Sequence, residues 1–277
     1  MTQALNDLIQ LLGLEALEEN LFRGQSQDLG LPQLFGGQAL GQSAAAATRT
    51  VPEDRYLHSL HGYFLRPGDA RLPVIYSVDR VRDGGSFTTR RVTAIQKGKP
   101  IFFCSASFQG PEHGLSHQPM APEVPSPEAL LAEGKAVHQR FRGHPVEFIT
   151  VEERHDCPPS RMIWFRMGGG TIQDKGMPAD PALHRYLLAY SSDFNLLLTS
   201  LLAHDVEFGD PRLRIASLDH ALWIHQDPKI DEWLLYVMES PWAGGARGFA
   251  RGSFYDREGR LIASTAQEGL VRVASDD

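Results

Sequence analysis

The sequence has few cysteines and lacks any long hydrophobic run. Its 277 residues contain two cysteines, Cys104 and Cys157, which are too few for a disulfide scaffold or for a zinc site built on cysteine. No apolar stretch approaches the roughly 18 residues that a membrane-spanning helix needs. The first residues lack the basic start and apolar core of a signal peptide, and the last four, Ala274 to Asp277, are no peroxisomal Ser-Lys-Leu signal. We therefore expect a cytoplasmic protein with reduced thiols and no membrane partner.

An excess of basic residues is also absent. Lysine and arginine number 27, aspartate and glutamate number 34, and the net charge is −7. Because nucleic-acid-binding proteins carry a basic surface, we expect no nucleic-acid partner. Hydrophobic residues at 42% and charged residues at 22% are typical of globular domains. The length fits about two domains or one large domain.

Several catalytic motifs are missing as well. The sequence has no Gly-x-Ser-x-Gly nucleophile elbow, no Walker phosphate loop and no His-Glu-x-x-His pair, and its Gly36–Gly41 segment does not match the dinucleotide fingerprint. Cys104 has no basic neighbour in the sequence that would activate its thiol as a nucleophile. The sequence therefore predicts no metal ion and shows none of these nucleotide-binding motifs.

Hydrophobic periodicity predicts three helices. Apolar residues at helical spacing within 2–18 predict an amphipathic helix. The small side chains of 39–48 favour a helix that packs closely against a sheet. Asp180 as N-cap and Pro181 at the first helical position begin a third helix, which apolar residues at three- and four-residue steps extend to Leu201.

Most other segments have the composition of β-strands. Alternating apolar and β-branched residues, bounded by turn-forming residues, are typical of strands in an antiparallel sheet. The predicted strands cover 21–24, 57–65, 73–78, 87–96 and 101–108 in the first half and 162–167, 213–223, 232–240, 246–255 and 261–273 in the second.

An internal repeat organises these elements. Three landmarks recur at nearly constant offsets: His220 follows His61 by 159 residues, Gly244 follows Gly84 by 160, and Gly259 follows Gly98 by 161. A nearly constant offset with the same strand order indicates a duplication. Each half then has one long helix wrapped by an antiparallel sheet, which is the α+β arrangement called the hotdog, and the whole chain is predicted to be a double hotdog.

The density of prolines in 111–145 predicts a connector between the two repeats. We expect an N-terminal hotdog repeat at 1–110, a connector at 111–145 with a short helix near 127–135, and a C-terminal hotdog repeat at 146–277.

Asp193 is the most informative polar residue. It lies between Tyr190 and Leu197 on or near the apolar face of the predicted third helix, where burying a carboxylate is costly unless it is hydrogen-bonded or used. From the residues alone two interpretations remain open. Asp193 either caps or kinks a helix on a solvated side, or it is a functional carboxylate.

Five segments of the chain resemble the type II acyl-CoA thioesterase family. They are Leu21–Ser26 (LFRGQS), Phe35–Gln38 (FGGQ), His61–Asp69 (HGYFLRPGD), Tyr190–Asn195 (YSSDFN) and Ala266–Gly269 (AQEG). The resemblance runs essentially from end to end, and the Phe-Leu-Arg-Pro-Gly-Asp segment is its most specific part. It implies a double hotdog that hydrolyses fatty acyl-CoA, here expected to be medium- or long-chain, to free fatty acid and CoA without a cofactor.

The same resemblance places the catalytic residues in the C-terminal repeat. The catalytic aspartate of the family falls on Asp193 as general base, and its catalytic glutamine falls on Gln267. Its third polar residue, usually threonine, falls on Ser217, which keeps the hydroxyl but loses the methyl group that stiffens the side chain. Ser217 and Gln267 would orient a water molecule for attack on the thioester. Backbone N–H groups near a helix N-terminus are the expected oxyanion donors.

Other polar residues are secondary candidates. His58 is a rival general base, although the favoured interpretation is a hydrogen-bonded strand histidine. Arginine side chains bind phosphate well, so five of them are candidates for the phosphates of CoA, against the alternative of ordinary ion pairs: Arg66, Arg90, Arg91, Arg247 and Arg251. The first half has no carboxylate equivalent to Asp193, so we expect it to supply mainly scaffold and pocket wall.

Two other functions stay open at this stage. An enoyl-CoA hydratase-like hotdog enzyme would need an Asp/His pair, for which Asp219-His220 is a poor match. A non-catalytic acyl-CoA-binding module is disfavoured by the complete set of Asp193, Ser217 and Gln267. Because hotdog sheets commonly pair between subunits, we also expect a homo-oligomer, either a dimer or a tetramer.

Overall fold

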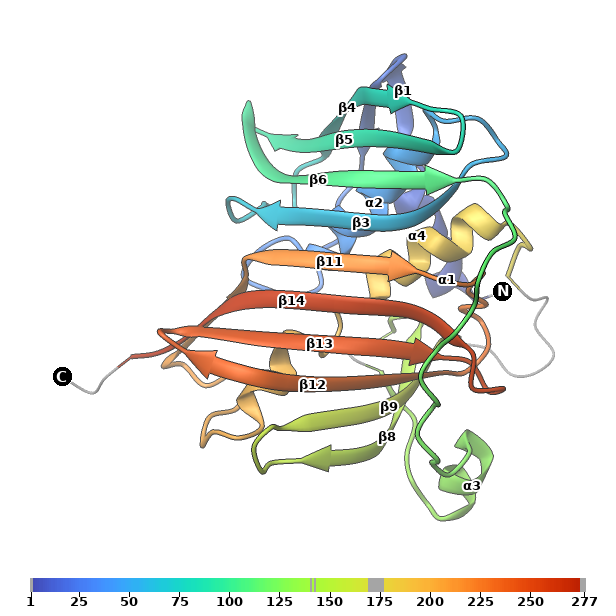
Figure 1. Ribbon diagram of the computed structural model, residues 1–277. Coiled ribbons are helices and arrows are strands. Elements are labelled where there is room, and N and C mark those ends of the chain that lie inside the picture. The colour runs from blue at the N-terminus through green and yellow to red at the C-terminus, as the bar shows by residue number, and fades with distance from the viewer. Residues whose placement is uncertain (1, 140, 142, 169–176, 275–277) are drawn as a thin grey trace.

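A curved antiparallel sheet wraps around the central helices of the protein (Figure 1). The computed structural model describes residues 2–139, 141, 143–168 and 177–274. Over these residues the sheet has 14 strands in the order β1-β2-β4-β5-β6-β3-β11-β14-β13-β12-β9-β8-β7, with β10 beside β14. The first half contributes β1 (Glu15–Glu18), β2 (Leu21–Gly24), β3 (Tyr56–Phe64), β4 (Val74–Asp83), β5 (Phe87–Gln96) and β6 (Lys99–Gln109). The second contributes β7 (His138–Gln139), β8 (Val146–Arg154), β9 (Ser160–Met167), β10 (Leu213–Ser217), β11 (Asp219–Ile224), β12 (Leu234–Gly244), β13 (Arg247–Tyr255) and β14 (Leu261–Val273).

The strand order reads as a palindrome about the middle of the sheet. The two halves meet where β3 and β11 pair antiparallel, with Leu60 opposite Leu222 and His61 opposite Ala221. On either side the corresponding strands follow in the same order, since β6, β5, β4 and β2 mirror β14, β13, β12 and β9. This arrangement, with one long helix inside each half, confirms the predicted double hotdog.

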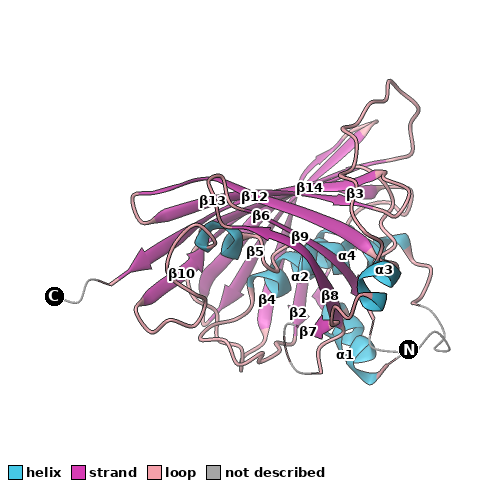
Figure 2. Ribbon diagram, turned by 90° about the horizontal axis from the view of Figure 1, so that it is seen from below, coloured by secondary structure: helices cyan, strands magenta, loops and turns pink. Residues whose placement is uncertain are grey.

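Two central helices, α2 (Gly36–Thr48) and α4 (Pro181–Ser191), lie on the concave side of the sheet (Figure 2). They approach each other closely because α2 presents glycines to α4. A Cβ atom at Gly37 would lie 2.1 Å from the carbonyl oxygen of Tyr190, and one at Gly41 would lie 3.1 Å from that of Tyr186. The small residues of α2 therefore serve contact with a second helix as well as the predicted contact with the sheet.

Two predicted helices are longer than the structure allows. The first, α1 (Gln3–Leu12), is capped at its start by the Thr2 hydroxyl and ends before Gly13. Residues predicted to continue it form β1, which pairs with β2. The prediction of one helix over 2–18 is therefore wrong, because strand pairing with β2 takes its last residues.

The predicted helix from Pro181 to Leu201 is also interrupted. It ends at Ser191, and a separate 3₁₀ turn, η1, covers Leu197–Leu201. Between them Asn195 adopts a φ of 64°, in the left-handed region. At the break, the Ser192 hydroxyl bonds to the Ala189 carbonyl and lies 2.9 Å from His220 Nε2. These side-chain bonds compete with helix continuation and place Asp193 after the helix instead of within it.

The remaining predicted strands overlap the observed ones, although β4 and β12 continue to Asp83 and Gly244, beyond their predicted ends. The predicted strand over 213–223 is divided at Leu218 into β10 and β11, and β7 and β8 were not predicted. In the connector, α3 (Pro127–Ala132) begins at a Ser126 cap. No helix among the described residues is long and apolar enough to cross a membrane.

Candidate active site

Asp193, Gln267 and Ser217 form one hydrogen-bonded cluster at the junction of the two halves. Asp193 follows α4, Gln267 lies in β14, and Ser217 ends β10. Gln267 Nε2 donates to Asp193 Oδ1 at 2.7 Å and to Ser217 Oγ at 2.9 Å. The structure thus brings together the three residues that the family resemblance singled out, although they are far apart in sequence.

The second carboxylate oxygen of Asp193 is held by the first half of the chain. The backbone N–H of Gly37, in the first turn of α2, donates to Asp193 Oδ2 at 3.0 Å. The preceding residue must also be small, since a Cβ atom at Gly36 would lie 2.7 Å from the same oxygen. The first half therefore contributes more than scaffold. The paired glycines at the start of a predicted helix were the available signal for this contact.

Burial and hydrogen bonding act on the Asp193 carboxyl in opposite directions. Burial raises its pKa above the ordinary value, while the bonds from Gln267 and Gly37 lower it, and burial is the larger effect. The positive end of the α2 dipole also favours the ionised form. The outcome is a carboxylate that is more basic than usual yet fixed in direction, which suits a general base.

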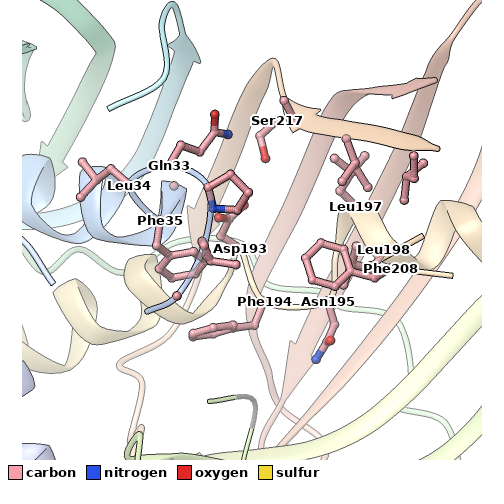
Figure 3. A pocket seen from close by; sticks show the side chains of 18 of the residues that line it. Gln33, Leu34, Phe35, Asp193, Phe194, Asn195, Leu197, Leu198, Phe208 and Ser217 are labelled. Carbon is pink, nitrogen blue, oxygen red and sulfur yellow. The ribbon is translucent and has the colours of Figure 1, made fainter. Parts of the chain in front are cut away.

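Asp193 and Ser217 face a cavity of about 570 Å³ (Figure 3). Phe35 from the first half stacks on Phe194 from the second, with ring centroids 4.6 Å apart. Most of the other lining side chains are apolar, and they come from both halves. They include Leu31, Phe141, Leu197, Leu198, Phe208, Leu213 and Ile215. An apolar chain can therefore be buried directly beside the carboxylate.

A second, smaller cavity of about 220 Å³ shares part of its wall with the first. Its walls come from the Phe64–Gly68 segment, from Ile101 and Phe102 of β6, and from Ala39 of α2. Both cavities are lined by Gln33–Gly36 and by Ser217. The hydroxyl of Ser217 and the start of α2 thus stand where the two cavities meet.

His58 does not join this cluster. It lies on β3 with its Nε2 atom 2.9 Å from Ser107 Oγ and its ring against Phe87. Burial and the neighbouring His61 lower its pKa. It lines neither cavity, so we do not retain it as a rival base.

Arg90 is the strand partner of Ala106, which takes the place of Gln267 in the first half. In the second half the corresponding partner of Gln267 is Ala250. Arg90 is 1% exposed. Its guanidinium donates to Thr50, to carbonyl oxygens and to Asp83. Arg90 is therefore unavailable to a CoA phosphate.

The other candidate arginines differ in position. Arg251 pairs with Glu239, and Arg247 lies 3.5 Å from Glu268 and over the Trp242 ring. Arg91 is exposed on β5, opposite Asp79. None of these three lines either cavity, whereas Arg66 lines the smaller one.

A buried polar network supports the chain at Asp193. The Tyr236 hydroxyl donates to the Ser192 carbonyl at 3.0 Å and lies 3.0 Å from Thr265 Oγ1. His220, beside the Ser192 hydroxyl, is fully buried, and burial lowers its pKa to about 3. The sequence showed no sign of this network, because its members meet only through β11, β12 and β14.

Comparison with known proteins places these features in a family context. The sequence profile of the acyl-CoA thioesterase family matches residues 167–270, and that of the acyl-CoA thioesterase N-terminal domain matches residues 25–109. The chain is 39% identical to acyl-CoA thioesterase 2 of Haemophilus influenzae, over 98% of this chain and 99% of that protein. It is also 39% identical to acyl-coenzyme A thioesterase 8 of Homo sapiens, over 95% of this chain and 88% of the other.

Solved structures give the same result. An acyl-CoA thioesterase II TesB2 from Mycobacterium marinum superposes with a TM-score of 0.83 at 38% identity, covering 98% of this chain and 99% of that one. A tesB protein of Mycobacterium avium subsp. paratuberculosis superposes with a TM-score of 0.84 at 32% identity, covering 97% and 99%. The similarity therefore extends over both halves and includes the junction where the polar cluster lies.

Proposed function

This chain belongs to the acyl-CoA thioesterase family and is a thioester hydrolase, and we propose that it cleaves medium- and long-chain fatty acyl-CoA to free fatty acid and CoA. The observation that carries the proposal is the apolar cavity of about 570 Å³ that opens at Asp193. Each methylene group buried there contributes roughly 0.8 kcal/mol. The size lies within the usual range for small-molecule sites.

In the proposed reaction a water molecule attacks the thioester directly. Asp193 accepts a proton from the water as its oxygen bonds to the carbonyl carbon. Gln267 fixes the direction of the carboxylate through its 2.7 Å bond. When the tetrahedral intermediate collapses, the carbon–sulfur bond breaks, and the proton held on Asp193 passes to the thiolate of CoA.

The negative charge on the carbonyl oxygen needs a donor in the intermediate. Ser217 Oγ already accepts from Gln267, so its own hydrogen is available to donate. The start of α2 lies beside it at the cavity junction, and helix N-termini favour anions. We assign the oxyanion to this region.

The direct test is thiol release from a panel of saturated acyl-CoA substrates, with the acid product identified by mass spectrometry. The proposal expects kcat/KM to rise from short to medium and long chains as apolar contact increases. Equal rates across the panel would overturn the assignment of chain length. Hydration of an enoyl-CoA without thiol release would overturn the reaction.

The hydratase alternative gains no support from the geometry. Asp219 and His220 are neighbours in β11, so their side chains point to opposite faces of the sheet. Asp219 accepts the backbone N–H of Glu268 at 2.7 Å, while His220 bonds to Ser192. The two side chains therefore do not form a pair. A non-catalytic binding module would not need a buried carboxylate fixed in direction, so the Asp193 geometry argues against that alternative.

We also propose that residues 1–110 and 146–277 are the two hotdog repeats, joined by the connector at 111–145, and the palindromic strand order supports this division. Strand β7 lies in the connector and pairs with β8 of the C-terminal repeat. A homo-oligomer is proposed as well, and the exposed Tyr63 and Trp223 side chains support it. Sedimentation analysis tests this, with a monomer as the contrary result. A cytoplasmic location is consistent with the free thiols of Cys104 and Cys157.

A further inference from the structure

Residues 64–68 of the Phe64–Asp69 segment form one wall of the smaller cavity, and the proposed hydrolysis does not explain this cavity. Phe64 packs on Phe102, with ring centroids 4.9 Å apart. Gly68 accepts the backbone N–H of Leu34 at 2.8 Å, and a Cβ atom there would lie 2.8 Å from the Leu34 side chain. The segment is thus fastened to the loop that precedes α2. Its close fit fixes a passage that ends at the proposed catalytic groups.

Arg66 lies in this segment and carries a positive charge that no carboxylate of the described residues pairs with. It is exposed, and its Nη1 atom donates to the Pro100 carbonyl at 2.7 Å. That contact steadies the guanidinium but leaves its other N–H groups available. Over the described part of the chain no carboxylate pairs with Arg66. Asp69, the acid of the same segment, pairs with Arg71 and Lys97 instead.

The two cavities differ in the charge around them. Among the described residues, Arg66 is the one charged residue that lines the smaller cavity. The larger cavity is lined by Asp193, Asp210 and Arg214, which gives a net charge of −1. An anionic ligand end is therefore favoured at the smaller cavity and disfavoured at the larger one.

We infer that the smaller cavity takes the pantetheine arm of CoA and that Arg66 binds a CoA phosphate, with help from Lys99, which precedes the Pro100 that Arg66 contacts. The inference rests on the proposed function, because the thioester must lie at the junction by Ser217. From there the substrate extends in two directions, with an apolar acyl chain on one side and an anionic nucleotide on the other. Only one assignment puts the acyl chain in the larger apolar cavity and the phosphates beside Arg66. Arginine suits this role, because its planar fork meets two phosphate oxygens at once.

The test compares one acyl group carried on CoA and on pantetheine, which lacks the phosphates. For Arg66→Gln, KM for acyl-CoA is expected to rise roughly tenfold, with kcat within about twofold of the parent. KM for acyl-pantetheine is expected to stay unchanged. Arg91→Gln, at an exposed position that lines neither cavity, is the matched control and is expected to alter neither value. An unchanged KM for acyl-CoA, or an equal rise with both substrates, would overturn the inference.

A binding measurement separates this inference from the proposed function. Calorimetric titration of the intact protein with CoA alone needs no turnover. Weaker binding by Arg66→Gln, with partial recovery in Arg66→Lys, supports the phosphate site even if no thioester is hydrolysed. Hydrolysis of acyl-CoA with CoA affinity unchanged in Arg66→Gln and in Lys99→Gln would leave the function standing and remove the site. Lys99→Gln also serves if the arginine variant does not fold.

Discussion

The backbone N–H of Gly37 donates to Asp193 Oδ2 across 3.0 Å, and this bond joins the first turn of a helix in one repeat to the proposed base in the other. Gln267, which lies in the same repeat as Asp193, donates to the other carboxylate oxygen, Oδ1. The reactive carboxylate is therefore fixed by both halves of the duplicated chain. The site depends on how closely α2 approaches the end of α4.

The close approach at Gly36 predicts that even one methyl group impairs the enzyme. In Gly36→Ala the new Cβ would lie 2.7 Å from Asp193 Oδ2 and 3.1 Å from the Phe64 ring, so the carboxylate must shift. A displacement near 1 Å costs on the order of 10²-fold in rate. We expect kcat for acyl-CoA to fall by about that factor. Gly85→Ala is the control, because its Cβ would meet no atom within 4 Å. Full activity in Gly36→Ala would show that Asp193 is not so tightly confined.

Removing the Gln267 amide is expected to change the pH dependence of kcat/KM. The bond from Gln267 lowers the pKa of Asp193, so Gln267→Ala should raise that pKa further. The acidic limb of the kcat/KM profile is then expected to move to higher pH, with kcat on its plateau reduced roughly 10- to 100-fold because the carboxylate loses its direction. An unchanged acidic limb would mean that Asp193 is not the titrating base.

Two buried histidines predict that the protein loses stability in mild acid. Burial lowers the pKa of His220 to about 3 and of His144 to about 4, against 6.5 when unfolded. Between these values the unfolded chain binds more protons, so stability is complete above about pH 6.5 and falls as the pH decreases. The raised pKa of Asp193 acts in the opposite sense. From pH 7.5 to 5.0 each histidine should cost roughly 2 kcal/mol in the free energy of unfolding.

Urea unfolding at the two pH values measures this loss. His220→Asn is expected to lose less stability on acidification than the parent, whereas the exposed control His117→Asn should lose as much. An equal loss in all three proteins would show that His220 titrates normally.

Local patterns in the sequence predict most of the strands and the helix of 36–48. The alternation in β5 even indicates that Arg90 is internal, because Arg90 lies on the same face of the strand as the buried Val92 and Ala94. Composition alone did not separate it from its exposed neighbour Arg91. The double hotdog follows from the repeat of strands and turns.

Features that depend on contacts between distant segments were not predictable. The end of α4 depends on the bonds of Ser192 to His220 and Tyr236, which lie 28 and 44 residues away. The partner of Asp193 on α2 is 156 residues away. Family resemblance identified the three residues of the site, Asp193, Gln267 and Ser217. No local pattern in the sequence predicts that they are in contact.

The account depends most on Asp193 as the group that removes a proton from water. Asp193→Asn keeps the size of the side chain and can still accept one of the bonds from Gly37 and Gln267 through its remaining oxygen, but it cannot take the proton. We expect its kcat for a long-chain acyl-CoA to fall by roughly 10² to 10⁴, with thermal unfolding and CoA affinity close to those of the parent. Asp219→Asn is the matched control and should remain active. A folded Asp193→Asn enzyme with near-parental kcat would contradict the account.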